Sequence, residues 1–121
     1  MTEISESDAN TTVSTIRAEV QQFGLERDWG KYHTPKNLSM SIAIEAAEIM
    51  EHFQWQSSEQ SSKLVREPEI KQLVADELAD VLIYCFILAD QAEIDISSAV
   101  RSKMARNQKR YPVGYMPPSG E

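Results

Sequence analysis

The stretch IAIEAAEIMEHFQW, residues 42–55, holds the pattern on which both the fold and the chemistry of this chain depend. Its apolar residues recur every three or four positions, which is the period of one helix face. Glu45, Glu48 and Glu51 nevertheless fall three residues apart in the same run. At roughly 100° per residue, Glu45 lies among the apolar side chains, Glu48 lies one step further round, and Glu51 turns toward solvent. A helix that buries this face therefore brings carboxylates to its core.

A second helix repeats the feature. Pro68 suits the first turn of a helix that we expect to run to about Ala92, because its missing N–H has no partner to lose there. In the same angular projection, Glu77 and Asp80 fall within the apolar face, whereas Asp76 points elsewhere. Two helices thus each direct an i, i+3 pair of acids at or near the core.

Four inward carboxylates need a positive partner. One buried, unpaired carboxylate costs several kcal/mol, and four would exceed the ~5–15 kcal/mol stability of a whole domain. Ligands that are all oxygens favour a hard cation, Mg²⁺ with Mn²⁺ as a possible substitute, over zinc. Ion pairs with arginine are the structural alternative.

The rest of the chain also shows helical patterns, and no alternating strand pattern appears. We predict an all-α fold with a four-helix bundle core in one domain over residues 11–112, preceded by a flexible leader, 1–10, and followed by an irregular tail, 113–121. The other expected helices run from a cap at Thr11 or Thr12 to about Trp29, from Asn37 or Ser39 to about Trp55, and from Asp95 or Ser97 to just before Pro112.

Composition narrows the setting. The 121 residues carry a net charge of −7, which disfavours a nucleic-acid partner. The longest apolar run, residues 81–89, is far shorter than the ~20 residues of a membrane span, so no membrane partner is expected. A single cysteine, Cys85, and a polar start without an apolar signal region suggest a cytoplasmic protein.

The last expected helix is strongly basic. It contains VRSKMARNQKRYP, residues 100–112, in which Lys103, Asn107 and Arg110 stand at i, i+4 and i+7 on one stripe. Lysine offers a point charge and arginine a fork that bridges two phosphate oxygens, so we interpret the stripe as a phosphate clamp. Cations that complement the negative end of the helix dipole are the alternative.

These motifs together resemble a known family. EAAE at residues 45–48 followed by ELAD at 77–80 resembles the E-x-x-E…E-x-x-D signature of the MazG-like all-α nucleoside triphosphate pyrophosphohydrolases. Four further stretches resemble the dCTP pyrophosphatase branch of that family: ERDWGKYHTPKNL, EHFQW, DVLIY and SKMARNQKRYP.

The resemblance implies hydrolysis of a (deoxy)nucleoside triphosphate to a monophosphate and pyrophosphate, as in nucleotide-pool cleansing, by a homo-oligomer of two or four chains. It implies Mg²⁺ bound by Glu45, Glu48, Glu77 and Asp80. As a mechanism we predict Glu48 and Glu45 as catalytic residues, with Glu48 taking or orienting the proton of the attacking water. The resemblance also implies phosphate contacts from Lys103, Asn107, Arg110, Tyr111 and Tyr84, and base contacts from Trp29, Trp55, His33 and Asn37. Val20 departs from the pattern, because dCTP-preferring relatives carry a histidine there.

Two other classes of protein were weighed. A di-iron enzyme would need Glu-x-x-His pairs, which neither acidic helix contains, so His33 and His52 are interpreted as ordinary surface or hydrogen-bonded residues. The second is a non-catalytic helical oligomerisation or interaction module that binds nucleotide without turning it over. Such a module, however, gains nothing from inward acids.

Overall fold

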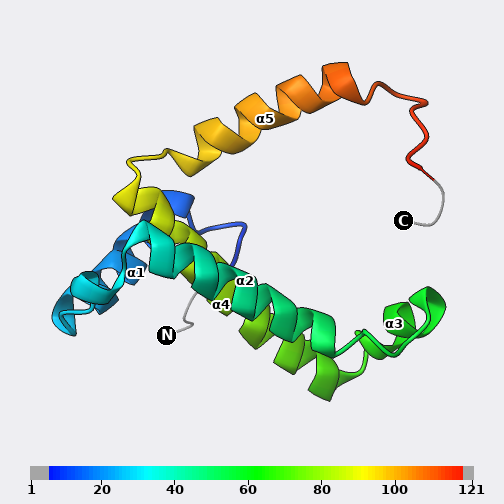
Figure 1. The fold of residues 1–121 in the computed structure, drawn as a ribbon, viewed down its shortest axis with the longest axis horizontal. Helices are drawn as coiled ribbons and strands as arrows, with labels where there is room; N and C mark the ends of the chain where they lie inside the picture. The colour runs from blue at the N-terminus through cyan, green and yellow to red at the C-terminus, as the bar shows by residue number, and fades with distance from the viewer. Residues whose placement is uncertain (1–5, 119–121) are drawn as a thin grey trace, which may run out of the picture.

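The computed structural model describes residues 6–118, and this part of the chain is helical with no strand, which confirms the all-α prediction (Figure 1). Its elements are α1 (Val13–Glu26), the short 3-10 helix η1 (Gly30–Tyr32), α2 (Pro35–Glu51), α3 (Ser58–Leu64), α4 (Pro68–Gln91) and α5 (Ile96–Arg110). None of these helices is long and apolar enough to cross a membrane.

Three of the four helix starts follow their sequence signals. Thr12 accepts a hydrogen bond from the Thr15 amide at the start of α1, and Asp95 accepts one from Ser98 at the start of α5. Pro68 begins α4 as expected. The side-chain oxygens of Thr12 and Asp95 satisfy amides that have no partner inside the helix.

The predicted start of α2 at Asn37 or Ser39 is wrong. The helix begins at Pro35, and the Thr34 hydroxyl caps it by accepting from the Asn37 amide at 3.2 Å. The fixed φ of proline suits the first helical position, so Pro35 opens the helix instead of belonging to the turn before it.

Two helices end earlier than predicted, and the segment between α2 and α4 contains an additional short helix, α3. The first ends at Glu26 rather than Trp29, where Asp28 takes a positive φ of 54°. The second ends at Glu51 rather than near Trp55. A capping box starts α3: the Ser57 side chain accepts from the Gln60 backbone amide, and the Gln60 side chain accepts from the Ser57 amide.

The predicted leader and tail are described only in part, because residues 1–5 and 119–121 lie outside the described range. Ser7 and Asn10 close a turn at residues 7–10, in which the Asn10 amide donates to the Ser7 carbonyl at 3.1 Å. Residues 111–118 contain no helix, in keeping with the prediction of an irregular tail.

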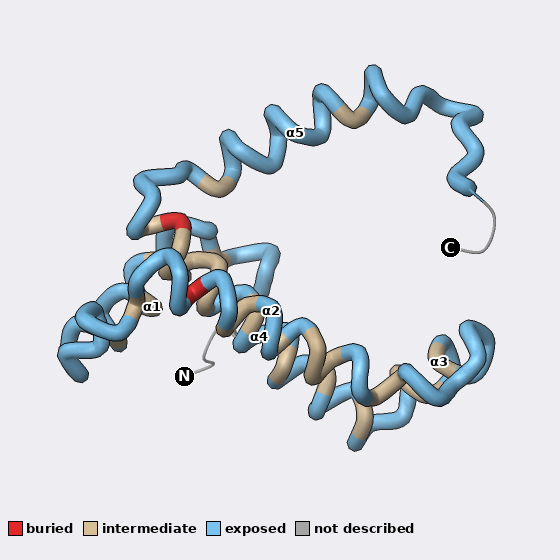
Figure 2. Tube along the Cα trace, viewed as in Figure 1, coloured by how far each residue is buried: buried red, intermediate tan, exposed pale blue. Residues whose placement is uncertain are grey.

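The main packing contact joins α2 to α4, which run antiparallel, and α1 crosses α4 (Figure 1). Leu38, near the start of α2, and Ala89, near the end of α4, are 1% and 5% exposed and are the buried hydrophobic residues of residues 6–118 (Figure 2). His52 just after α2 meets Glu77 of α4 at the other end of the contact. These two points set the register of the helix pair that carries the acids.

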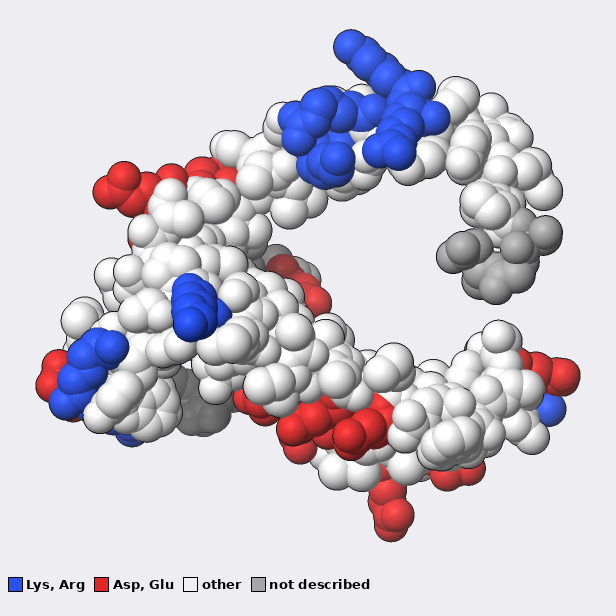
Figure 3. Space-filling model, in the orientation of Figure 1, with Lys and Arg blue, Asp and Glu red and all other residues white. Residues whose placement is uncertain are grey.

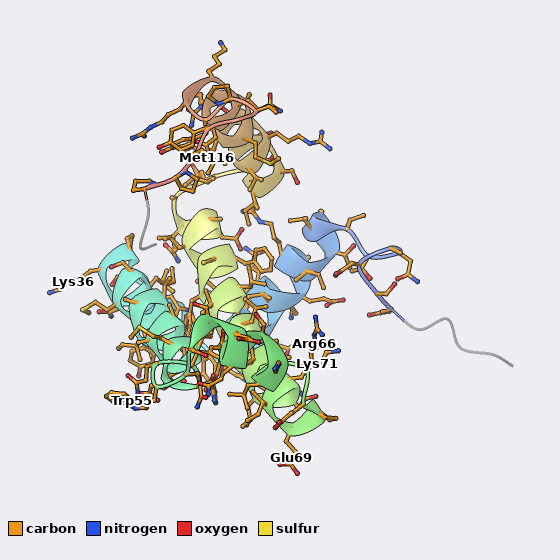
Figure 4. The ribbon with its side chains drawn as sticks, turned by 90° about the vertical axis from the view of Figure 1, so that its right-hand side faces the viewer. Lys36, Trp55, Arg66, Glu69, Lys71 and Met116 are labelled. Atoms are coloured by element: carbon orange, nitrogen blue, oxygen red, sulfur yellow. The ribbon has the colours of Figure 1, made fainter. Side chains whose placement is uncertain are left out.

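The last helix, α5, extends away from this body as an arm (Figures 1 and 4). It makes no extensive contact with α1, α2 or α4, and its apolar residues Val100 and Met104 are exposed. Within one chain, therefore, only α1, α2 and α4 form the predicted bundle core. A basic helix with few apolar residues has little apolar surface with which to pack.

The root of the arm is held by Arg17 of α1. Its Nη2 and Nε donate to Asp90 Oδ1 at 2.6 and 3.2 Å, and its Nη1 donates to the Ile94 carbonyl at 2.8 Å. One guanidinium thus ties α1 to the end of α4 and to the link that leads into α5. The same link contains Glu93 with a φ of 55°.

Replacing Arg17 with alanine should lower the free energy of unfolding by about 1–2 kcal/mol, because it removes charge-assisted hydrogen bonds that are only partly open to water. The pair is 19% and 28% exposed at its side chains. Urea unfolding measures the change. Arg66→Ala is the control, since Arg66 is exposed and forms no ion pair in the described range. Equal losses in the two variants would contradict the clamp.

Candidate metal and nucleotide site

The four predicted acids come together where α2 packs against α4. Glu48 lies one helical turn before His52, and Asp80 lies about one turn after Glu77. Since His52 and Glu77 are in contact and the helices are antiparallel, the two pairs of acids lie at neighbouring levels. Glu45, Glu48 and Glu77 are half-buried, and Asp80 is exposed.

Glu45 shows the strain of this arrangement most clearly. Its Oε2 atom is buried and has no hydrogen-bond partner. Burial is the largest cause that raises its pKa above the ordinary value of 4.5, followed by hydrogen bonding with Glu48. The negative charges of Glu48, Asp80 and Glu77 raise the pKa further. The other three acids therefore all lie close enough to act on Glu45.

The donor set fits a hard cation. Within residues 6–118 no lysine or arginine forms an ion pair with any of the four acids, so the arginine alternative finds no support. The unpartnered Glu45 oxygen is the kind of ligand that Mg²⁺ or Mn²⁺ takes. As they stand, the described side chains do not bring three metal ligands together. Binding would require the carboxylates to rotate inward.

The raised pKa of Glu45 predicts a pH-dependent gain in stability for Glu45→Gln. In the metal-free protein, the stability that goes with protonated Glu45 is fully present below pH 4.5 and is lost as pH rises through its higher folded pKa. In EDTA, the melting temperature of the variant should equal that of wild type below pH 4.5 and exceed it by a few degrees at neutral pH. A lower melting temperature at neutral pH would contradict the repulsion.

A cavity of about 430 Å³ adjoins the acids. Its lining residues come from α1, the η1 region and α4: Glu19, Val20, Phe23, Gly24, Trp29, His33, Asp80, Ile83, Tyr84 and Ile87. The Trp29 ring packs edge-on against Phe23, with ring centroids 5.5 Å apart. It also meets the His33 ring edge-on, with centroids 6.4 Å apart. A cavity of this size and aromatic character suits a flat heterocycle.

The predicted base-contacting residues divide into two groups. Trp29 and His33 line the cavity together with Tyr84, which the resemblance assigned to phosphate, and with Asp80. Trp55 is 86% exposed and lies at the outer edge of the helical body (Figure 4). Asn37 uses its side-chain amide to donate to the Tyr32 carbonyl at 3.0 Å, which holds the η1 turn. Neither Trp55 nor Asn37 lines the cavity.

The predicted phosphate-binding residues of the basic stripe lie on the arm. Lys103, Asn107 and Arg110 belong to α5, and Tyr111 follows at its end. Figure 3 shows the cations of α5 across an open space from the acids of the α2–α4 body. Within one chain, the structure does not bring the basic stripe to the carboxylates.

Two residues of the site were missed by sequence reasoning. His52 contacts Glu77, which agrees with its interpretation as a hydrogen-bonded residue, but it was not named as part of the acidic site. Its position four residues after Glu48, on the same helix face, was the available signal. Phe23 was not among the predicted site residues, but it is 49% exposed and forms part of the cavity wall.

Comparison with known proteins identifies the family. Residues 40–115 match the MazG-like family. The chain is similar to dCTP pyrophosphatase 1 of Rattus norvegicus, with 39% identity over 102 residues that cover 84% of this chain and 60% of that protein. For dCTP pyrophosphatase 1 of Homo sapiens the identity is 38% over 101 residues, covering 84% and 59%. The chain thus spans about 60% of the length of these curated relatives.

The fold has a counterpart among solved structures. The crystal structure of a pyrophosphatase from Archaeoglobus fulgidus superposes with a TM-score of 0.78 at 40% sequence identity. The match covers 91% of this chain and 99% of the archaeal one. These similarities show that the chain belongs to the MazG-like family.

Proposed function

We propose that this protein hydrolyses a (deoxy)nucleoside triphosphate between the α- and β-phosphates, with Mg²⁺, to yield a nucleoside monophosphate and pyrophosphate. The observation that carries the proposal is a cluster of four carboxylates, one with an unpartnered buried oxygen, beside an aromatic-lined cavity. Asp80 belongs to both the cluster and the cavity. Relatives named dCTP pyrophosphatase and pyrophosphatase support the same reaction class.

Each part of the site has a role in this reaction. Bound Mg²⁺ would polarise phosphate oxygens and neutralise the acids. Glu48, with Glu45 beside it, would accept the proton of the water that attacks the α-phosphorus. The Trp29 ring would stack on the base, an interaction worth ~1–3 kcal/mol. Lys103 and Arg110 would stabilise the negative charge that builds on departing pyrophosphate.

The residues that line the cavity do not identify the preferred nucleobase. Val20 lines it, and a valine side chain offers no hydrogen bond to a heterocycle. Selectivity would then depend on polar side chains of the cavity wall, among them Glu19, His33 and Tyr84. We propose a deoxynucleoside triphosphate as substrate, in cleansing of the nucleotide pool. A cytoplasmic location, suggested by the lone cysteine, stays a prediction.

We also propose that the protein works as a homo-oligomer. The single chain exposes 10042 Å², whereas a compact monomer of its mass would expose about 6,600 Å². Ile44 on α2 and Leu78 and Leu82 on α4 are among the exposed apolar side chains. A second copy would cover them. It would also allow the basic stripe of one chain to lie over the acids of another.

The test is pyrophosphate release from a panel of dNTPs and NTPs, in Mg²⁺, in Mn²⁺ and in EDTA. We expect cleavage of at least one deoxynucleoside triphosphate with either metal and none in EDTA. If well-folded, oligomeric protein cleaves no triphosphate, the enzymatic proposal fails. Nucleotide binding without turnover would then favour the non-catalytic interaction module.

A further inference from the structure

We propose that His52 is a positioning residue that holds the Glu77 carboxylate in the orientation required for cation binding. This inference rests on the proposed metal-dependent function. Among the described residues, Glu77 is the one of the four acids that is hydrogen-bonded to a histidine, His52 at the end of α2. The three remaining acids form no ion pair.

The contact is short and partly enclosed. His52 Nε2 lies 2.6 Å from Glu77 Oε2, and the two side chains are 20% and 22% exposed. The histidine is the C-cap residue of α2, so its backbone is anchored by the helix. Its ring also meets Phe53 edge-on, with centroids 6.3 Å apart. The imidazole therefore has little freedom to turn away from the carboxylate.

The chemistry of the pair sets which atom donates. An ionised carboxylate has no hydrogen to give, so Nε2 must carry the proton and donate it to Oε2. The other carboxylate oxygen, Oε1, then stays available for a cation. A ligand carboxylate whose second oxygen is hydrogen-bonded in this way loses fewer rotamers when metal binds.

The hydrogen bond also acts against repulsion within the cluster. Glu77 adds negative charge to a site in which Glu45 already has a raised pKa. A donor on Oε2 offsets part of the negative charge of Glu77. His52 thereby lets four carboxylates stay together before a cation arrives.

A purely structural role would look different. If His52 served only to join α2 to α4, its loss would lower the stability of the metal-free protein and leave the affinity for metal unchanged. If it held Glu77 away from the site, its loss would strengthen metal binding. Positioning alone predicts weaker metal binding that a replacement donor restores.

The experiment is Mn²⁺ titration without nucleotide, followed by electron paramagnetic resonance, on wild type and three variants. His52→Leu removes the donor and should weaken Mn²⁺ affinity by about 10-fold or more. His52→Gln places an amide N–H near the position of Nε2 and should recover most of the affinity. His52→Asn is the matched control, because its amide is too short to reach Oε2 and it should behave like the leucine variant.

The outcomes separate this inference from the proposed function. Unchanged or tighter Mn²⁺ binding in His52→Leu, or equal losses in His52→Gln and His52→Asn, would overturn the positioning role alone. Wild type that binds Mn²⁺ but cleaves no triphosphate would overturn the enzymatic function and leave the positioning role standing. Wild type that binds no Mn²⁺ would overturn both. Melting in EDTA shows whether each variant is folded.

Discussion

Glu48→Gln should reduce pyrophosphate release by about 10³-fold or more, while the metal-free protein melts at or above the wild-type temperature. The substitution keeps the size of the side chain and removes its charge. Glu48 is half-buried, and its negative charge contributes to the raised pKa of Glu45. Loss of that charge relieves repulsion in the absence of metal and removes a proton acceptor and cation ligand in its presence.

Opposite effects on activity and stability are what distinguish a functional site from a structural one. A residue in a structural ion pair stabilises the fold, so its neutralisation lowers the melting temperature. Glu48 has no cationic partner in the described range. Steady-state kinetics with Mg²⁺ and thermal unfolding in EDTA measure the two effects separately.

Asp76→Asn is the matched control for this experiment. Asp76 lies next to Glu77 on α4, but it is exposed and accepts a hydrogen bond from Gln72 at 2.8 Å on the outer face. Its neutralisation removes the same unit of charge from the same helix region, and turnover should stay within about twofold of wild type, as for other surface changes. A large loss of activity in Asp76→Asn would point to a general charge effect. A clear fall in the stability of Glu48→Gln would argue against the site.

The acidic cluster was predictable from sequence because helix geometry is local. The spacing of Glu45 and Glu48, and of Glu77 and Asp80, determines which face of its own helix each acid occupies. An apolar face must pack, so the two faces meet, and the structure places α2 against α4 as that argument requires. The side-chain contact between His52 and Glu77 was not predictable in this way, because it depends on the register between helices.

The position of the basic helix was not predictable for a related reason. The spacing of Lys103, Asn107 and Arg110 shows that they share a stripe, and α5 forms over the expected residues. Spacing does not say which surface the stripe meets. In the described part of the chain α5 packs only weakly on its own body, so the surface that it meets is not determined by the helix pattern.

Trp29 and Trp55 illustrate the same limit at the cavity. The resemblance assigned both to the base, but of the two Trp29 alone lines the cavity, because the η1 turn carries it toward Phe23 and α4. Trp55 follows the end of α2 and is left exposed. A second chain is the remaining route by which Trp55 could reach a nucleotide.

Mixing two inactive variants should restore activity if the arm of one chain serves the acids of another. Asp80→Asn disables the carboxylate side of a site and leaves the arm intact. The double variant Lys103→Ala, Arg110→Ala does the reverse. After subunit exchange at equal amounts, about one quarter of the sites would combine wild-type acids with a wild-type arm, whatever the size of the assembly.

The expected result is therefore about a quarter of the wild-type rate from a mixture whose components are each nearly inactive. The control mixture combines Asp80→Asn with Glu48→Gln, which both damage the carboxylate side. Random assembly of these two yields no intact carboxylate side, so it should restore nothing. Pyrophosphate release before and after exchange measures both mixtures.

The mixing experiment also tests the alternative in which the chain closes on itself. The arm is connected to α4 only through residues 92–95, and Arg17 holds the start of that link through Asp90 and Ile94. Closure of α5 onto its own acids would require a change in the backbone of this link, which Arg17 holds at Ile94. In that case every site would lie within one chain, and the mixture of complementary variants would stay as inactive as its components. Restored activity requires α5 to cross between chains, which is the arrangement that an intact Arg17 clamp and an arm without a partner on its own body both favour.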